Sequence, residues 1–331
     1  MIKEFVAFSG RDGATFFLSC RSWRDWRISL EFYRGVGARA KLKKAVCFIL
    51  YPWGRLFAKD NIHSVAGEIA DALHIPPPAI PEGPASALIS MTRDKAVIHH
   101  HGRGYEKFAS GDSLPDVRNE LAVYELLDKK KPKTFQYSQI DRGENTSEYV
   151  RFFMSYAPGK HRDRHPELSS LLGVLTEFFS LTPPKTVSWR ELWDGLDLPE
   201  LLSAIPAAFL EGQTPVGLVH RDFKPWNVKN GEKPLIYDFE SVSFAGCPLE
   251  DFFNYVVDPL LHRHSPAKVL RRIRRRYWQM AAAFLEEMRI PSKEVQRYWC
   301  WYLAERIAFW RRHKQPGFAE NFVKMLRWSL D

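Results

Sequence analysis

The stretch Val219-His-Arg-Asp-Phe-Lys-Pro-Trp-Asn-Val228, with Pro234-Leu-Ile-Tyr-Asp-Phe-Glu240 shortly after it, is the most informative part of this 331-residue chain. Between the two segments lies Asn230-Gly231, a dipeptide that favours a tight turn between antiparallel strands. The apolar residues on either side therefore predict a hairpin. Such a hairpin would bring Asn227, at the end of one arm, close to Asp238, at the end of the other.

Three polar side chains of this segment predict phosphoryl-transfer chemistry. The carboxylate of Asp238 and the amide oxygen of Asn227 are ligands that suit Mg²⁺ when phosphate oxygens and water complete its shell. Asp222 precedes Asn227 on a loop entered from a strand, so it would face the same space and accept a proton from a hydroxyl group. Two metal ligands and one base are the minimum for this reaction. The alternative is that Asp222 and Asn227 are turn residues and Asp238 a capping group.

The same segment resembles the catalytic loop and metal-binding segment of the aminoglycoside phosphotransferase and choline kinase family, which is related to the protein kinases. The loop keeps the Arg and the Lys that protein kinases prefer, and Asp238-Phe-Glu240 stands where protein kinases have Asp-Phe-Gly. Pro248-Leu-Glu-Asp251 resembles the short segment that opens the next helix in this family and supports the catalytic loop. In order and motif the resemblance covers about residues 86–260, roughly half of the chain.

The resemblance implies an α+β fold with the two lobes of a protein kinase, a small β-rich N-lobe and a large helical C-lobe, here with an extra N-terminal segment. The expected domains are a basic and aromatic extension over 1–85, a nucleotide-binding N-lobe over 86–157, and a helical C-lobe with the catalytic loop and acceptor site over 158–331. The first boundary is placed at the segment Pro76–Pro84 because it contains five prolines, which exclude a helix or a central strand there.

The resemblance also assigns cofactors and catalytic residues. ATP and Mg²⁺ are the implied cofactors, and the reaction is transfer of the γ-phosphate to a hydroxyl of a small molecule or glycan. Asp222 and Lys224 are the catalytic candidates. Asn227 and Asp238 are the candidate metal ligands.

Nucleotide-binding residues are implied further upstream. Lys107 lies on the expected third strand of the N-lobe, where its charge would bind the α- and β-phosphates. Glu120, on the following helix, would hold that lysine in place. Ser155 and Tyr156 fall at the link between the lobes, where backbone groups would hold the edge of adenine.

One departure from the family concerns the turn that should cover the phosphates. Met91-Thr-Arg-Asp-Lys-Ala96 contains no glycine. Either backbone amides still reach the phosphates, or the side chains of Arg93 and Lys95 substitute for them. The alternative function is a pseudokinase that binds nucleotide or a partner without turnover.

The hydrophobic pattern predicts the remaining elements. Residues 5–20 read as a hairpin, residues 37–75 as helical pieces, and a helix begins near Ser113. Short strands are expected at 86–90, 96–100, 105–109 and 149–156. Beyond residue 160 the pattern is mainly helical, interrupted by strands near 217–240; the predicted helices are 168–181, 188–195, 198–212, 248–259, 264–289, 293–313 and 316–329.

The net charge of +9 is concentrated in two patches, residues 21–60 and residues 262–281, each with a net charge of +7. Such patches attract anions, although a basic helix can also be an ordinary solvated surface. In the first patch aromatic and apolar residues interleave with the charges. That pattern fits a segment lying on an anionic membrane, and an ordinary core helix fits it too.

Composition sets the expected partners and location. The acceptor is expected to be anionic or membrane-associated, such as a lipopolysaccharide-core or capsule sugar, because a site for cationic aminoglycosides would be lined with carboxylates. No nucleic acid is expected, since no base-stacking platform or groove-reading motif appears. The chain lacks a secretory signal, an apolar stretch of about 18 residues and paired cysteines, so the expected location is cytoplasmic, with peripheral contact at the inner face of the membrane.

Overall fold

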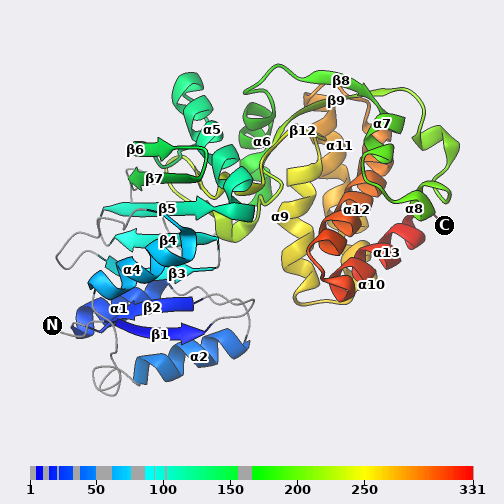
Figure 1. The fold of residues 1–331 in the computed structure, drawn as a ribbon. Coiled ribbons are helices and arrows are strands. Elements are labelled where there is room, and N and C mark those ends of the chain that lie inside the picture. Colours follow the sequence, from blue (N-terminus) through cyan, green and yellow to red (C-terminus); the bar gives the residue numbers. More distant parts are fainter. Residues whose placement is uncertain are drawn as a thin grey trace. The chain divides into compact units, whose positions relative to one another are not determined.

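The computed structural model describes residues 5–9, 15–20, 22–32, 38–49, 62–75, 86–92, 94–100, 103–155 and 166–330. The chain divides into two compact units. Unit 1 comprises Met1–Tyr124 and Ser138–Pro158, and unit 2 comprises Glu125–Tyr137 and Gly159–Asp331. The predicted α+β class is confirmed, because an antiparallel sheet fills the N-terminal part and helices dominate the C-terminal part (Figure 1). The predicted domain boundaries stay predictions.

Unit 1 is built on one seven-stranded antiparallel sheet with the order β1-β2-β3-β4-β5-β7-β6. Its strands are β1 (Phe5–Ser9), β2 (Thr15–Ser19), β3 (Ser86–Met91), β4 (Lys95–His100), β5 (Gly104–Ser110), β6 (Ile140–Asn145) and β7 (Tyr149–Ser155). The predicted N-terminal hairpin and the four predicted strands are confirmed. The sequence did not predict β6, or that β2 pairs directly with β3.

Two layers of helix pack on the sheet of unit 1, because neighbouring residues of a strand point to opposite faces. Phe17 joins an apolar cluster with Val65 and Ile69 of helix α4 (Ile62–Leu73). Leu18, the next residue, joins a second cluster with α1 (Trp23–Phe32) and α2 (Ala38–Ile49). The indole N–H of Trp26 donates to the carbonyl of Cys47 at 3.0 Å and so ties α1 to α2.

Helix α5 (Leu114–Lys130) confirms the helix predicted near Ser113, and the boundary between the units falls inside it. The described residues of unit 2 form a three-stranded sheet, a two-stranded hairpin and seven further α-helices of six residues or more. The strands are β8 (Lys185–Ser188), β9 (Gln213–Val219), β10 (Val228–Lys229), β11 (Leu235–Ile236) and β12 (Ser243–Gly246). The helices are α6 (Leu172–Phe179), α7 (Trp189–Asp194), α9 (Glu250–Leu261), α10 (Pro266–Arg272), α11 (Trp278–Glu287), α12 (Val295–Arg312) and α13 (Pro316–Leu330), together with the short α8 (Pro199–Leu202).

One helix prediction in unit 2 is wrong. Of the predicted helix 198–212 only α8 and one 3-10 turn, Ala207–Phe209, form. Pro206 lacks the N–H that a continuing helix needs, and Gly212 has a φ of 75°, which ends the segment before β9. The strands β8 and β12 were not predicted either.

The core of unit 2 is aromatic and surrounds α9. Every residue of α9 from Glu250 to Asp258 is buried. The ring of Phe253 lies 4.8 Å from that of Trp299 and 5.3 Å from that of Tyr302 on α12. Burial of such large rings stabilises a helix strongly, so α9 is a rigid support for what lies on it. Within the described part of the chain, no helix is both long and apolar enough to cross a membrane.

Candidate active site

The loop after β9 has an unusual backbone that one carboxylate holds in place. Arg221 has a φ of 59°, in the left-handed region that a residue with a side chain seldom adopts. Asp251, on α9, accepts hydrogen bonds from the backbone N–H groups of His220 at 2.6 Å and Arg221 at 2.8 Å. The side-chain amide of Asn254 donates to the carbonyl of Arg221 at 2.9 Å. The predicted support of the loop by the segment that ends at Asp251 is confirmed.

Asp251 is important for the loop conformation because its side chain is buried away from water. The residue is 3% exposed, and burial raises the pKa of its carboxyl group to about 7, against the opposing effect of the two N–H donors. Removing the carboxyl group would leave two backbone donors without their partner, and such orphaned groups cost about 1–3 kcal/mol each. The loop conformation therefore depends on α9.

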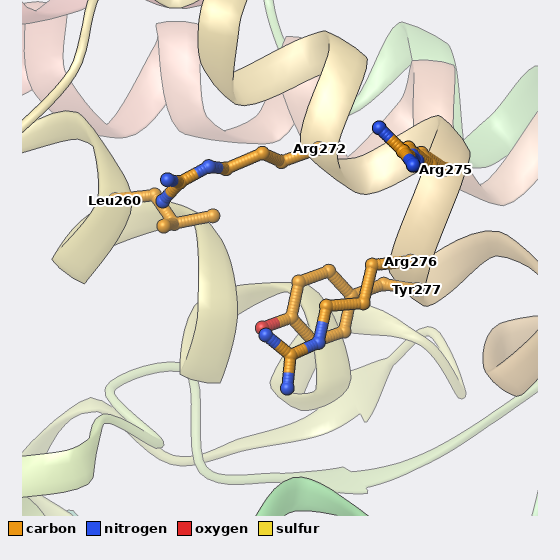
Figure 2. A pocket seen from close by; sticks show the side chains of 5 residues that line it. All are labelled: Leu260, Arg272, Arg275, Arg276 and Tyr277. Carbon is orange, nitrogen blue, oxygen red and sulfur yellow. The ribbon is translucent and has the colours of Figure 1, made fainter.

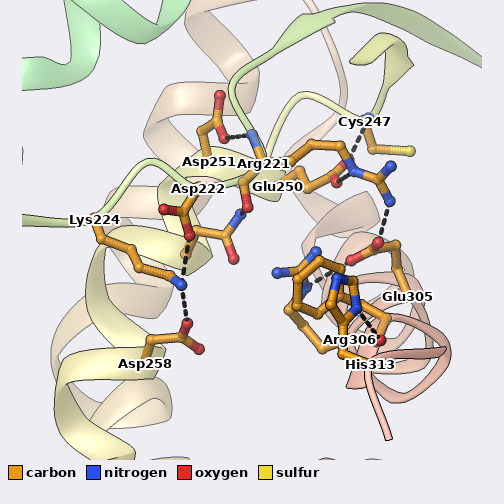
Figure 3. Close-up of polar contacts among 12 residues, drawn as sticks. Arg221, Asp222, Lys224, Cys247, Glu250, Asp251, Asp258, Glu305, Arg306 and His313 are labelled. Carbon is orange, nitrogen blue, oxygen red and sulfur yellow. Dashed lines mark hydrogen bonds and ion pairs between the residues drawn. The ribbon is translucent and has the colours of Figure 1, made fainter. Parts of the chain in front are cut away.

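The side chain of Arg221 is fastened by a buried ionic network (Figure 3). Its Nε donates to Glu250 at 2.9 Å, and its Nη2 donates to Glu305 on α12. Glu305 also accepts from Arg306 at 2.6 Å, and both side chains are 1% exposed. Burial alone would raise the pKa of Glu305, but the guanidinium groups of Arg306 and Arg221 lower it. Glu305 therefore stays ionised and holds the loop to α12.

Asp222, the predicted base, is oriented by two neighbours. Its Oδ2 accepts from Nδ2 of Asn227 at 2.7 Å, and its Oδ1 lies 2.5 Å from Nζ of Lys224. Lys224 also pairs with Asp258 of α9 at 3.0 Å. Burial alone would lower the pKa of Lys224, but the charges of Asp258 and Asp222 raise it. The lysine therefore keeps a positive charge beside Asp222, whose side chain remains 27% exposed and accessible to a ligand.

The hairpin predicted around Asn230-Gly231 forms from β10 and β11, with Val228 opposite Ile236. The N–H of Tyr237 donates to the carbonyl of Asn227 at 3.3 Å, so Asp238 follows directly beside the end of the loop. Asp238 is in the left-handed region, with φ 69° and ψ 63°. Backbone strain of this kind is common at functional sites, where the fold has to aim one side chain.

The residues of unit 2 fit a divalent cation. Asn227 uses its amide nitrogen in bonds to Asp222, which leaves the amide oxygen as the atom that a metal would take. Carboxylate oxygens of Asp238 and Glu240 lie within 4.8 Å of one another. Oxygen ligands of this kind suit Mg²⁺, a hard cation that keeps water and phosphate oxygens in its remaining positions.

In unit 1 the structure brings together the predicted lysine and glutamate. Lys107 is on β5 and Glu120 on α5, and Nζ of Lys107 lies 2.5 Å from Oε2 of Glu120. Both residues are buried, Glu120 completely. A lysine held in this way presents a fixed point charge, which suits a phosphate group.

The glycine-free turn between β3 and β4 is closed by its own backbone. The N–H of Thr92 donates to the carbonyl of Lys95 at 2.7 Å, and the hydroxyl of Thr92 contacts the same carbonyl at 3.2 Å. The carbonyl of Asp94 accepts from the N–H of Ser110 at 2.9 Å. The N–H of Thr92 is therefore already used, and a phosphate would need other donors. Arg93 lies outside the described residues.

The two residues predicted to hold adenine have different outcomes. Ser155 ends β7, and its N–H donates to the carbonyl of Gln139 at 2.9 Å, so this N–H is occupied within unit 1. Tyr156 lies outside the described residues. The assignment of both to adenine stays a prediction.

Sequence reasoning missed the residues that fasten the loop from distant helices. Asp258, Glu305 and Arg306 are buried and charged, and all three contact the loop or its partners. One signal was available for two of them. Glu305-Arg306 stands inside the apolar and aromatic run Trp299–Trp310, where an adjacent acid and base favour a buried ion pair.

No protein-family model and no curated protein sequence matches the chain. Three solved structures illustrate its similarity to known folds. An aminoglycoside phosphotransferase APH(4)-Ia mutant with ADP and hygromycin B is 12% identical, with 80% of this chain and 98% of that chain covered and a TM-score of 0.45. A putative fructosamine-3-kinase from Haemophilus somnus is 12% identical, with 72% and 87% covered and a TM-score of 0.46. APH(2")-IIa with gentamicin is 14% identical, with 70% and 87% covered and a TM-score of 0.41.

These structures belong to the kinase-like phosphotransferases that the sequence resembles. At such identities the similarity is one of fold, and we take no substrate or partner from it.

Replacing Glu305 tests the ionic network. Glu305→Ala would leave the buried guanidinium of Arg306 without its carboxylate partner and take one of two carboxylates from Arg221, so we expect the free energy of unfolding to fall by about 3–5 kcal/mol. Because the pKa of Glu305 is lowered, this contribution is present above the ordinary glutamate pKa and is lost as the pH falls below it. Urea unfolding at neutral and acidic pH measures both effects. Glu287→Ala, at an exposed position of α11, is the control; equal stability of the two variants would contradict the assignment.

Proposed function

We propose that the chain is an ATP-dependent phosphotransferase that moves the γ-phosphate to a hydroxyl of a small molecule or glycan. The observation that carries this proposal is the position of Asp222, whose carboxylate is held by Asn227 and Lys224 beside the strained Asp238. In this proposal Asp222 is the base and Lys224 orients it. Asn227 and Asp238 are the metal ligands.

The nucleotide has its own proposed partners in unit 1. Lys107, held by Glu120, would bind the α- and β-phosphates. Ser155 and Tyr156 would contact the adenine edge. Since the turn between β3 and β4 has no glycine, more of the phosphate binding would come from the charge of Lys107.

The residues of the loop would act on the acceptor as follows. The bond between the γ-phosphorus and the β–γ bridging oxygen breaks, and a new bond forms between that phosphorus and the acceptor oxygen. Asp222 takes the hydroxyl proton, and ADP leaves. Lys224 keeps Asp222 oriented and spreads positive charge near the transferred group. Mg²⁺, when bound, would neutralise charge on the phosphate oxygens.

A pseudokinase is the alternative function, and one observation favours it. The N–H of Thr92 is used inside the glycine-free turn, so the backbone offers less to the phosphates than a glycine-rich turn would. Such a protein would bind nucleotide or a partner without turnover. Assays that separate binding from transfer distinguish the two functions.

Asp222→Asn tests the base. The variant keeps the size of the side chain but loses the proton acceptor, so we expect turnover to fall by about 10²–10⁴-fold while the fold is retained. Steady-state phosphate transfer, with circular dichroism as a check on folding, measures this. Asp194→Asn, at an exposed position of α7, should leave turnover unchanged. An unchanged kcat in Asp222→Asn would remove Asp222 from the mechanism.

Asp238→Ala and Asn227→Ala test the metal site. The carboxylate offers a full negative charge and the amide only a dipole, so Asp238→Ala should abolish Mg²⁺-dependent nucleotide binding and Asn227→Ala should weaken it. Calorimetric titration of nucleotide with and without Mg²⁺ measures this. If Asp238→Ala bound the nucleotide with the Mg²⁺ dependence of the wild type, the metal assignment would be wrong.

For the acceptor we propose an anionic or membrane-associated glycan, such as a lipopolysaccharide-core or capsule sugar. Residues 262–281 carry seven basic side chains and no acidic one. A surface of this charge repels cationic aminoglycosides and attracts phosphorylated or carboxylated sugars. No nucleic acid is part of the proposal.

A peripheral contact of the N-terminal part with an anionic membrane, at the cytoplasmic face, belongs to the same proposal. Leu42, Val46 and Ile49 of α2 follow helical spacing and are 66%, 45% and 75% exposed. Trp23 of α1 is 41% exposed and packs edge-on against Phe48 at 4.8 Å. The sequence of α2 contains four basic residues and no acidic one. An apolar helix face among basic residues is typical of helices that lie in a membrane interface.

Vesicle co-sedimentation tests the membrane contact. The wild type should sediment with vesicles that contain phosphatidylglycerol and much less with pure phosphatidylcholine, and binding should fall as salt is added. The double variant Leu42→Glu with Ile49→Glu should lose binding. Phe244→Glu, at a residue 44% exposed on β12, is the matched control and should retain it. Equal binding of the wild type to both kinds of vesicle would contradict the proposal.

A further inference from the structure

Unit 2 contains a cavity of about 500 Å³ that lies outside the catalytic loop. It is lined by Leu260 near the end of α9 and by Arg272, Arg275, Arg276 and Tyr277 from the helix that begins at α10 (Figure 2). Its volume is in the range of roughly 300–1,000 Å³ that small-molecule sites occupy. Three guanidinium groups and one phenol ring are an unusual lining, and we call this cavity the arginine pocket.

The spacing of the arginines explains why they share one face of the helix. Arg275 and Arg276 follow Arg272 by three and four residues, the intervals that place helix side chains side by side. Residues Ile273–Tyr277 form a turn of π-helix, a rare irregularity that is common at functional sites. In Figure 2 the side chains of Arg272 and Arg276 both extend towards the side where Leu260 lies.

The same helix carries two arginines that face elsewhere. Arg271 and Arg274 line a second hollow, together with Trp328 of α13, and Arg275 borders both hollows. Arg274 donates to the carbonyl of Trp328 at 3.0 Å. These two side chains match the arginines of the pocket in charge and in position along the helix, and they are therefore natural controls.

The positive charge of the arginine pocket is not neutralised within the described part of the chain. None of Arg272, Arg275 and Arg276 forms an ion pair with a described carboxylate. The nearest polar partner of Arg272 is Nε2 of His264, at 2.6 Å. Desolvation and the positive charges around His264, that of Arg272 first, lower the pKa of this histidine. The pocket therefore has charge available for an anionic ligand.

Contacts through α9 connect the arginine pocket to the catalytic loop. Asp258 pairs with Lys224 of the loop at 3.0 Å, and Leu260, two residues further along α9, lines the pocket. The rings of Trp226 and His262 are 6.1 Å apart, which joins the loop to the residues just after α9. The catalytic loop and the arginine pocket therefore both contact α9 and the residues just after it.

We propose that the arginine pocket binds a phosphate monoester carried by the acceptor, and this rests on the phosphotransferase function proposed above. Guanidinium groups present paired N–H donors that match phosphate oxygens, and two or more of them suit a dianion better than a monocarboxylate. The guanidinium of Arg276 lies over the ring of Tyr277, 5.6 Å from the ring centroid, so charge and ring together form one surface against which a sugar phosphate can pack. The acceptor is a phosphorylated sugar, and its phosphate fixes which hydroxyl reaches Asp222.

Calorimetric titration of the full chain with glucose 6-phosphate, in the absence of nucleotide and Mg²⁺, tests ligand binding in the arginine pocket. The wild type should bind glucose 6-phosphate and should not measurably bind glucose. Arg272→Gln with Arg276→Gln should weaken binding by about 10–100-fold, because charge-assisted hydrogen bonds are lost. Arg271→Gln with Arg274→Gln should bind as the wild type does. Equal loss in both double variants, or equal affinity for the two sugars, would overturn the proposal.

A second titration separates a sugar phosphate from a lipid phosphate. Vesicles containing phosphatidic acid should not compete with glucose 6-phosphate for the pocket. If they displaced it, and did so less well in Arg272→Gln with Arg276→Gln, the ligand would be a lipid headgroup and the sugar-phosphate proposal would be wrong.

The outcomes also distinguish this proposal from the proposed function. Asp222→Asn should bind glucose 6-phosphate normally. A wild-type protein that binds glucose 6-phosphate but transfers no phosphate would support the pocket and contradict the proposed function. In transfer assays the pocket variant should raise the KM for a phosphorylated acceptor with little change in kcat. Transfer to a phosphorylated sugar with the same KM in wild type and pocket variant would keep the function and reject the pocket.

Discussion

The carboxylate of Asp251 is the constraint on which the candidate active site depends. It accepts from two successive backbone N–H groups, those of His220 and Arg221, at the point where the chain turns into the left-handed region. Those donors are buried, so their hydrogen bonds are worth more than they would be in water. Once the backbone is fixed here, Asp222 follows in one orientation, and the hairpin that carries Asp238 can align with it.

The charges around this loop have two different tasks. Arg221 is partly buried and pairs with the buried Glu250 and Glu305, and Glu305 pairs with the buried Arg306, so these residues hold the loop in place and are poorly placed to meet a ligand. Buried ion pairs of this kind add little net stability but specify one arrangement, because breaking any of them leaves a charge without a partner. The arginines of the pocket, Arg272, Arg275 and Arg276, are different, since they are exposed and form no ion pair with a described carboxylate. The first group fixes the geometry of the loop, and the second is available to bind a ligand.

The sequence predicted the local parts of this site and not the distant ones. The turn at Asn230-Gly231 and the apolar arms beside it determine the hairpin, so the approach of Asn227 to the segment of Asp238 could be predicted from a short stretch. The pairing of Lys107 with Glu120 was implied by the family resemblance, and the structure brings the two side chains together from a strand and the helix that follows it. Glu305 lies 84 positions after Arg221, and nothing in either local pattern indicates that they meet.

Two errors of fold prediction have different physical causes. Strand β6 was missed because most of its residues are polar and exposed, as expected for an edge strand whose pattern carries little hydrophobic signal. The helix expected over 198–212 failed because Pro206 interrupts it, although the apolar spacing on both sides is helical. Strand pairing in the folded sheet determines β6, and the missing N–H of Pro206 ends the helix expected over 198–212.

We propose that Asp222, Asn227 and Asp238 form a working phosphotransfer site. The most direct measurement is ³¹P NMR of Mg²⁺-ATP incubated with the full chain and a panel of phosphorylated and neutral sugars, with Asp222→Asn beside it. We expect the γ-phosphate signal to be replaced by that of a new phosphomonoester together with ADP, and Asp222→Asn to slow this conversion by about 10²–10⁴-fold. Saturable binding of Mg²⁺-ATP with no phosphomonoester from any acceptor would contradict the claim and leave the pseudokinase as the better description.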